Sequence, residues 1–118
     1  MGGDSGGGGL ALSLLLACRD RGVGLPAAAF ALSAVTDLTC SGESMRTRAA
    51  ADLLINTNIV PEAAALYLGA ADSRSPLVSP VFGDGRRRPP LLLQVGDAEV
   101  MLSDSTRVAE RWRRAGSR

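Results

Sequence analysis

The sequence predicts an α/β fold, in which helices alternate with buried parallel strands. Three observations point to this fold class. Residues 10–18 form an apolar run of good helix formers within a helix expected over residues 7–21. Residues 91–95 (LLLQV) form a short apolar run between a proline and a glycine, which is typical of a parallel strand covered on both faces. Residues 105–115 place Val108 and Trp112 one helical turn apart, on one face of a further helix.

The first expected helix, residues 7–21, consists mainly of leucine, alanine and glycine. It is apolar on most faces, which predicts that it is buried, and Gly22 follows it as a C-cap glycine. Cys18 lies on this helix. Neither Cys18 nor Cys40 matches a metal or redox spacing, so we expect both cysteines to be reduced.

The middle of the chain predicts one strand, two helices and a long loop. Residues 27–34 are apolar and short, which favours a buried strand. We expect a helix over residues 45–55 and a second over 61–68, where a proline and a glutamate suit the first turn. Residues 69–90 are rich in proline and glycine and are expected to be a loop.

Two strands make a poor free-standing sheet, because both keep unpaired edges. We therefore expect the 118 residues to be an interior part of a larger doubly wound domain. On this interpretation the chain begins just after one strand and ends where another would follow.

Composition argues against several classes of partner. The net charge is +1, so no nucleic-acid partner is expected, and the Arg86–Arg88 run has no interleaved aromatic side chain and is interpreted as a solvated loop. The apolar run from Leu10 to Ala17 is too short to span a bilayer. A signal peptide would have basic residues before its apolar segment, and no basic residue precedes this run. We expect a cytoplasmic protein without a membrane partner.

The most informative motif is Gly3-Asp4-Ser5-Gly6-Gly7, a G-x-S-x-G pattern at the start of a helix. In a nucleophile elbow the chain turns sharply from strand to helix and exposes the serine hydroxyl. The same letters surround the nucleophile of chymotrypsin-like proteases, which are all-β proteins. The helical run that follows Ser5 favours the hydrolase elbow over the protease.

The chain contains no histidine. A Ser-His-acid triad within these residues is therefore excluded, as is a histidine-ligated zinc site. The sequence supplies the setting of a nucleophile without the base that would activate it.

Several collinear segments point to one family. The sequence resembles the hormone-sensitive-lipase-like branch of the α/β hydrolases, the α/β hydrolase fold-3 group of bacterial esterases. The segments are GDSGG at 3–7, RDRG at 19–22, TDLT at 36–39, SGES at 41–44, ALYLG at 65–69, PLVSP at 76–80, LLLQVG at 91–96 and EVMLSDS at 99–105.

The resemblance implies a fold for the whole chain. Residues 1–118 would be a partial α/β-hydrolase domain, from the nucleophile elbow to the helix after the strand that carries the acid. Its mostly parallel, doubly wound sheet would have helices on both faces. The N-terminal strands and the C-terminal strand and helix of the family would be missing.

The resemblance also implies a serine esterase mechanism on small carboxylic esters, with no metal or organic cofactor. Ser5 matches the nucleophile, and the Gly6 backbone N–H matches an oxyanion-hole donor. Glu99 is the better match to the triad acid and Asp97 is the alternative. Asp104 suits the start of the last helix and is expected to cap it.

Parts of the family's machinery have no match in the chain. The family's His-Gly-Gly-Gly segment lies upstream of the elbow and its triad histidine lies downstream of the last helix. We therefore expect the chain alone to be inactive. The alternative is a non-catalytic product that binds a partner through exposed sheet edges. The sequence makes no prediction about self-association.

Overall fold

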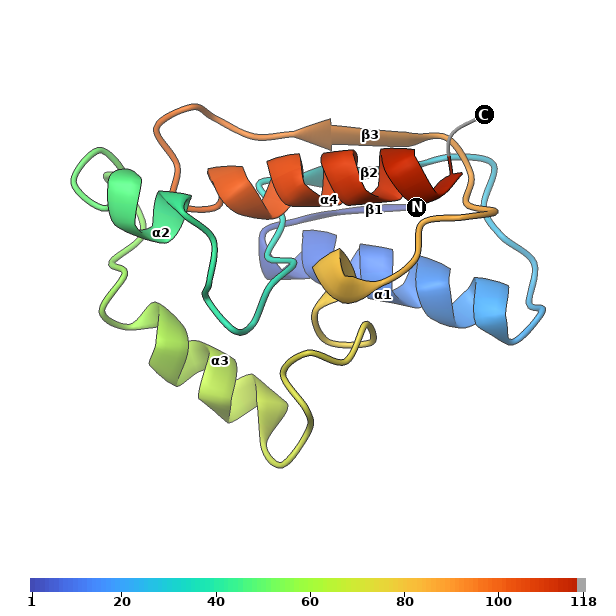
Figure 1. Cartoon of the computed structure of the whole chain (residues 1–118), viewed down its shortest axis with the longest axis horizontal. Coiled ribbons are helices and arrows are strands. Elements are labelled where there is room, and N and C mark those ends of the chain that lie inside the picture. Colours follow the sequence, from blue (N-terminus) through green and yellow to red (C-terminus); the bar gives the residue numbers. More distant parts are fainter. Residues whose placement is uncertain (117–118) are drawn as a thin grey trace.

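The computed structural model describes residues 1–116, which form a small parallel sheet with helices packed on it (Figure 1). The elements in chain order are β1 (Gly2–Asp4), α1 (Gly6–Asp20), β2 (Ala29–Leu32), α2 (Ser44–Thr47), α3 (Val60–Leu68), the 3-10 helix η1 (Pro80–Phe82), β3 (Leu91–Gln94) and α4 (Leu102–Gly116). The predicted α/β fold is confirmed.

The sheet has the order β1-β2-β3, and both pairs of strands are parallel. Its register places Gly3 beside Ala31 and Ala31 beside Leu93 on one face. Helices α1 and α4 pack against this face. Because the strands are parallel, their carboxyl ends meet at one edge, and the chain leaves β1 and β2 there to enter the candidate site.

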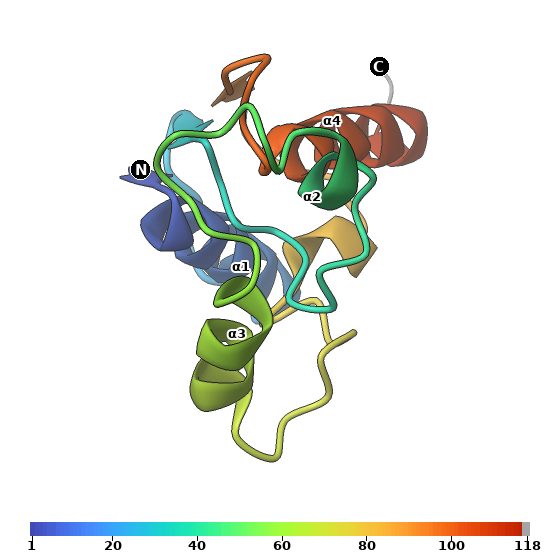
Figure 2. The ribbon, with the colours of Figure 1, turned by 90° about the vertical axis from the view of Figure 1, so that its left-hand side faces the viewer.

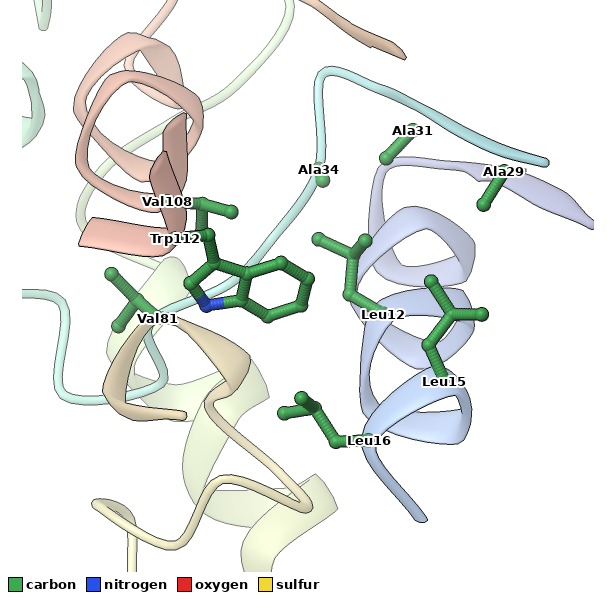
Figure 3. Packing of buried hydrophobic residues seen from close by; sticks show 9 residues of the cluster. All are labelled: Leu12, Leu15, Leu16, Ala29, Ala31, Ala34, Val81, Val108 and Trp112. Atoms are coloured by element: carbon green, nitrogen blue, oxygen red, sulfur yellow. The ribbon is translucent and has the colours of Figure 1, made fainter. Parts of the chain in front are cut away.

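Trp112 is the largest side chain of the core, and it lies between α4, α1 and η1 (Figure 3). Only 1% of it is exposed. Its indole N–H donates a hydrogen bond to the Pro80 carbonyl at 3.2 Å, so the polar atom of the ring is satisfied. Val108 is fully buried beside it, which confirms the predicted inner face of the last helix.

The opposite face of the sheet is open within the described residues. Phe30 on β2 and Leu92 on β3 are register partners there, and they are 45% and 60% exposed. Gly2 on β1 leaves room for the Phe30 ring, which lies where a Gly2 side chain would be. This row of residues is an apolar surface that no described helix covers.

The prediction of two strands was wrong, because the structure has three. The extra strand, Gly2–Asp4, leads directly into the elbow. Its three residues include two glycines, so no apolar pattern announces a strand. It forms because its backbone pairs with β2.

The helix predicted over residues 45–55 was also wrong in length, because α2 spans only Ser44–Thr47. The Asp52 carboxylate accepts hydrogen bonds from the backbone N–H groups of Leu54 and Ile55, and this local turn competes with a helix. The same carboxylate accepts from the Val100 N–H at 2.9 Å. A tertiary contact thus stabilises the turn over the helix.

Helix α3 lies apart from the sheet (Figures 1 and 2). Ala64 is its one buried residue, while Leu66 and Tyr67 are mostly exposed. The predicted helices over 7–21, 61–68 and 105–115 are otherwise found within a few residues of their expected bounds. Across residues 1–116, no helix combines the length and apolar character that a membrane crossing needs.

Candidate active site

Ser5 occupies a sharp turn between β1 and α1. Its φ of 56° and ψ of −120° lie in a backbone region that residues other than glycine rarely adopt. Two backbone hydrogen bonds hold this conformation: the Ser5 N–H donates to the Leu32 carbonyl at 2.8 Å, and the Val35 N–H donates to the Ser5 carbonyl at 3.0 Å. Such strain persists only where the surroundings enforce it, and it is common at functional sites.

Two glycines allow the turn to be this tight. A Cβ on Gly3 would lie 2.1 Å from the Gly7 carbonyl oxygen, and a Cβ on Gly9 would lie 1.9 Å from the Val35 carbonyl oxygen. Both distances are far inside van der Waals contact. The glycine run is therefore required where α1 crosses β1 and the segment after β2. Gly6 differs, since a Cβ there would meet no atom within 4 Å.

The start of α1 presents free amide groups beside Ser5. The Gly8 and Gly9 N–H groups donate to the Ser5 carbonyl. The Gly6 and Gly7 N–H groups have no hydrogen-bond partner within residues 1–116. Unpaired amides at a helix N-terminus favour negative charge, as an oxyanion hole requires.

Ser5 lies at the wall of a pocket with a volume of about 570 Å³. The lining is mainly apolar and comes from α1, α3, the segments that follow β2 and precede α3, and the residues just before η1 and α4. Its side chains include Leu10, Val35, Tyr67 and Met101. A mostly apolar pocket with a few polar groups is the usual form of a small-molecule site.

Glu99 lies in the turn after β3, at the same carboxyl edge of the sheet as Ser5. Its Oε2 atom accepts hydrogen bonds from the Gly96 N–H and from the Ser33 hydroxyl, the latter at 3.0 Å. Ser33 follows β2 directly, so it lies between the strand that leads to Ser5 and the strand that leads to Glu99.

Asp97 lies in the same turn, but it faces solvent. Its side chain is 96% exposed and pairs with Arg48 at 3.6 Å. The Arg48 guanidinium also donates to the Asp97 carbonyl at 2.6 Å. Of the two carboxylates that the sequence offered, only Glu99 is hydrogen-bonded to a residue at the end of a neighbouring strand.

Hydrogen bonds with Ser44 on α2 hold the turn that carries Glu99. The Ser44 hydroxyl donates to the Val100 carbonyl, and the Ser103 N–H donates to the Ser44 hydroxyl at 2.8 Å. The Ser103 hydroxyl in turn accepts from the Ser44 N–H at 2.8 Å. Together with the Asp52 bond to Val100, these contacts attach the Glu99 turn and the start of α4 to α2 and to the segment that follows α2.

A buried carboxylate network lies beneath the site, and sequence reasoning missed it. Asp104 does not cap its own helix, contrary to the sequence prediction. Its carboxylate accepts from the backbone N–H groups of Thr36 and Asp37 at 2.8 and 3.1 Å, so it attaches α4 to the segment after β2. Burial raises the pKa of Asp104 to about 6, and the neighbouring Asp37 charge adds to the rise.

Asp37 behaves in the opposite way. Burial raises the pKa of this carboxyl, but hydrogen bonds from Thr39, Ser41 and Arg107 outweigh it and lower the pKa to about 2. The Arg107 guanidinium lies 2.6 Å from the carboxylate. Asp37 lies in the segment TDLT and Asp104 in the segment SDS. Nothing in the sequence shows that the two segments are in contact in the fold.

The Cys40 thiol is not activated as a nucleophile. Burial raises the pKa of the Cys40 thiol, and the charges of Asp37 and Asp104 add to this, so the thiol stays protonated at neutral pH. Both cysteines are unpaired. Among residues 1–116, no three histidine, cysteine, aspartate or glutamate side chains cluster in a way that could hold a metal ion.

Comparisons with known proteins gave matches that extend over nearly the whole chain. A family model described as alpha/beta hydrolase fold matches residues 1–118. The chain is 44% identical over 115 residues to an acetyl-hydrolase of Streptomyces hygroscopicus, and 36% identical over 110 residues to an esterase of Acinetobacter venetianus. These matches cover 98% and 92% of this chain but 38% and 36% of the two relatives.

A solved structure gives the same result in three dimensions. The chain superposes on an esterase from the bacterial hormone-sensitive lipase family with a TM-score of 0.93 and 44% sequence identity. The match covers 97% of this chain and 38% of that esterase. The chain therefore spans less than half the length of the relatives that it matches.

Proposed function

This chain belongs to the α/β hydrolase fold family, and on that premise we propose that it carries the nucleophile and the acid of a serine esterase that acts on small carboxylic esters. The observation that supports the proposal best is the strained Ser5 turn, with its unpaired amides and adjoining apolar pocket. Relatives named esterase and acetyl-hydrolase support the ester as substrate.

In the proposed reaction the Ser5 Oγ attacks the ester carbonyl carbon. A C–O bond to Ser5 forms and the bond to the alcohol breaks, which leaves an acyl-enzyme that water then hydrolyses. The Gly6 N–H donates to the oxyanion that develops, and the Gly7 N–H is placed to assist it. The apolar pocket binds the carbon chain of the ester.

The proton of Ser5 needs an acceptor that these 118 residues do not supply, because they contain no histidine. We propose that Glu99 orients a histidine from outside these residues, which takes the Ser5 proton and passes it to the oxygen of the departing alcohol. Asp97 is not favoured for this role, because its exposed side chain pairs with Arg48.

The test is a chimera in which residues 1–118 replace the matching segment of the Streptomyces acetyl-hydrolase. We expect the chimera to hydrolyse p-nitrophenyl acetate or butyrate, and Ser5→Ala to lower kcat/KM by about 10³-fold or more. Glu99→Gln should lower kcat by roughly 10²–10⁴-fold. Asp97→Asn serves as the matched control and should change kcat by less than about 3-fold.

The isolated chain provides a second test. We expect it to hydrolyse these esters no faster than its own Ser5→Ala variant, since it lacks the base. Hydrolysis by the isolated chain that disappears in Ser5→Ala would show that the base lies within these residues. An active chimera that tolerates Ser5→Ala would exclude Ser5 as the nucleophile.

The alternative function, binding of a partner without catalysis, is favoured by one observation. The Phe30 and Leu92 surface is apolar, and β1 and β3 are the edge strands of the described sheet. A chimera without esterase activity, together with a tight complex between the isolated chain and a full-length relative, would favour this function.

A further inference from the structure

Ser33 lies between the Ser5 elbow and the turn that carries Glu99. It is the first residue after β2, and its φ of 48° places it in the left-handed region. Its N–H donates to the Gln94 carbonyl at the end of β3, at 2.8 Å. Two residues further on, the Val35 N–H donates to the Ser5 carbonyl. The backbone around Ser33 is therefore attached to both the elbow and the acid-bearing strand.

The Ser33 hydroxyl donates a hydrogen bond to only one oxygen of the Glu99 carboxylate, Oε2. Oε2 accepts from the Ser33 hydroxyl and from the Gly96 N–H. A carboxylate oxygen has two lone-pair sites, so these two donors fill Oε2. Within residues 1–116, Oε1 has no hydrogen-bond partner. Only Oε1 remains able to accept a further donor.

We infer that Ser33 is a positioning residue: it fixes the Glu99 carboxylate through Oε2, so that Oε1 is the oxygen that receives the N–H of the catalytic base. This inference rests on the proposed function. A long glutamate side chain on a turn has several rotamers, and a donor fixed by the sheet selects one of them. Ser33 acts through Glu99 and does not touch the substrate.

The first experiment uses the active chimera with Ser33→Ala and Ser33→Gly. Both variants remove the hydroxyl, but glycine also relieves the left-handed backbone, so a backbone effect would separate them. We expect both to lower kcat by about 10–100-fold with KM within about 3-fold, since the acid contributes to the chemical step. Ser41→Ala is the matched control, because it removes a hydroxyl bound to the Asp37 carboxylate, and it should change kcat by less than about 2-fold.

A double-mutant cycle then decides how Ser33 acts. In the Glu99→Ala background we expect Ser33→Ala to change kcat by less than about 2-fold, because the group that it positions is gone. A full Ser33 effect in that background, or an unchanged kcat in the single variants, would overturn the inference. Activity that survives Ser5→Ala would instead reject the proposed function.

A second measurement on the 118-residue chain itself does not depend on activity. Three-bond couplings across the Glu99 side chain report whether it keeps one rotamer in solution. We expect a single rotamer in the unmodified chain and averaged couplings in Ser33→Ala and Ser33→Gly. Couplings that stay unchanged in both variants would overturn the inference, whatever the chimera does.

Discussion

At the scale of single residues, the site depends on Ser5 adopting a backbone conformation that suits glycine better than serine. The strain is of the order of 1–3 kcal/mol for such positions. Two hydrogen bonds from neighbouring segments enforce it, through Leu32 and Val35. The fold thus gives up some stability at the position that carries the proposed nucleophile.

The strain can be measured by comparing Ser5→Gly with Ser5→Ala. Both variants lose the hydroxyl, but only glycine accepts a φ of 56° without steric cost. We expect the free energy of unfolding in urea to be about 1 kcal/mol higher for Ser5→Gly than for Ser5→Ala. Equal values for the two variants would show that the turn is unstrained.

A second comparison at this scale separates the two kinds of glycine in the elbow. Gly3→Ala places a methyl group against the Gly7 carbonyl and should lower the free energy of unfolding by about 2 kcal/mol or more. Gly6→Ala meets open space within a helix and should raise it by up to about 1 kcal/mol. Urea unfolding of both variants checks this, and a neutral Gly3→Ala would contradict the close approach.

At the scale of elements, α4 is attached to the segment after β2 by charged groups as well as by Trp112. Asp104 on α4 accepts from two backbone N–H groups, while Arg107 one turn later pairs with Asp37. The same segment carries Ser33 and Val35, which contact Glu99 and Ser5. The docking of α4 therefore bears on the geometry of the site.

Asp104 and Asp37, the two carboxyl groups between α4 and the segment after β2, make the stability of the fold depend on pH in opposite directions. The pKa of Asp104 is about 6 in the fold, above its ordinary value of 3.8, so the folded state binds a proton more tightly than the unfolded state. Its contribution to stability is then present below pH 4 and is lost as the pH rises to 6. The pKa of Asp37 falls to about 2, so its contribution is present above pH 4 and is lost as the pH falls towards 2.

Asp104→Asn tests this account. The difference in unfolding free energy between the unmodified chain and the variant should fall as the pH rises from 4 to 6, by up to about 3 kcal/mol. Urea midpoints measured at several pH values give this difference. A constant offset between the two proteins over that range would mean that the pKa of Asp104 is not raised by burial.

At the scale of the whole molecule, the chain has one packed face and one open face. The core of α1, α4 and η1 covers one side of the sheet, while Phe30 and Leu92 remain exposed on the other. Exposed apolar sheet surfaces and unpaired edge strands promote association. The chain matches less than half of its relatives' length, and its pocket is bordered by α3, which lies apart from the sheet.

We expect the isolated chain to self-associate in a concentration-dependent way through this open face. The double variant Phe30→Thr/Leu92→Thr should lower the apparent mass, because threonine keeps the strand but removes apolar area. The double variant Leu53→Thr/Leu54→Thr is the control, since both leucines are almost fully exposed but lie outside the sheet. Sedimentation of all three proteins as the same monomer would contradict the expectation.

The amino-acid sequence was enough to predict most of the local elements and the strand-turn-helix elbow around Ser5. The spacing of apolar residues, the runs of helix-forming residues and the G-x-S-x-G motif each depend only on nearby positions in the sequence. They were enough to predict α1, β3 and α4 and to propose a role for Ser5. The same holds for the Val108 and Trp112 face, where one helical turn of spacing is enough to define the buried side.

Which distant groups come into contact depends on tertiary packing. The strand Gly2–Asp4 exists because β2 pairs with it, and the helix predicted over residues 45–55 is cut short where Asp52 bonds to Val100. Asp104 and Ser33 gain their partners from residues more than sixty positions away. The physical reason is that a hydrogen bond or a charge pair depends on distance in space, which packing sets, whereas the letters of a sequence carry reliable information only over a few neighbouring positions.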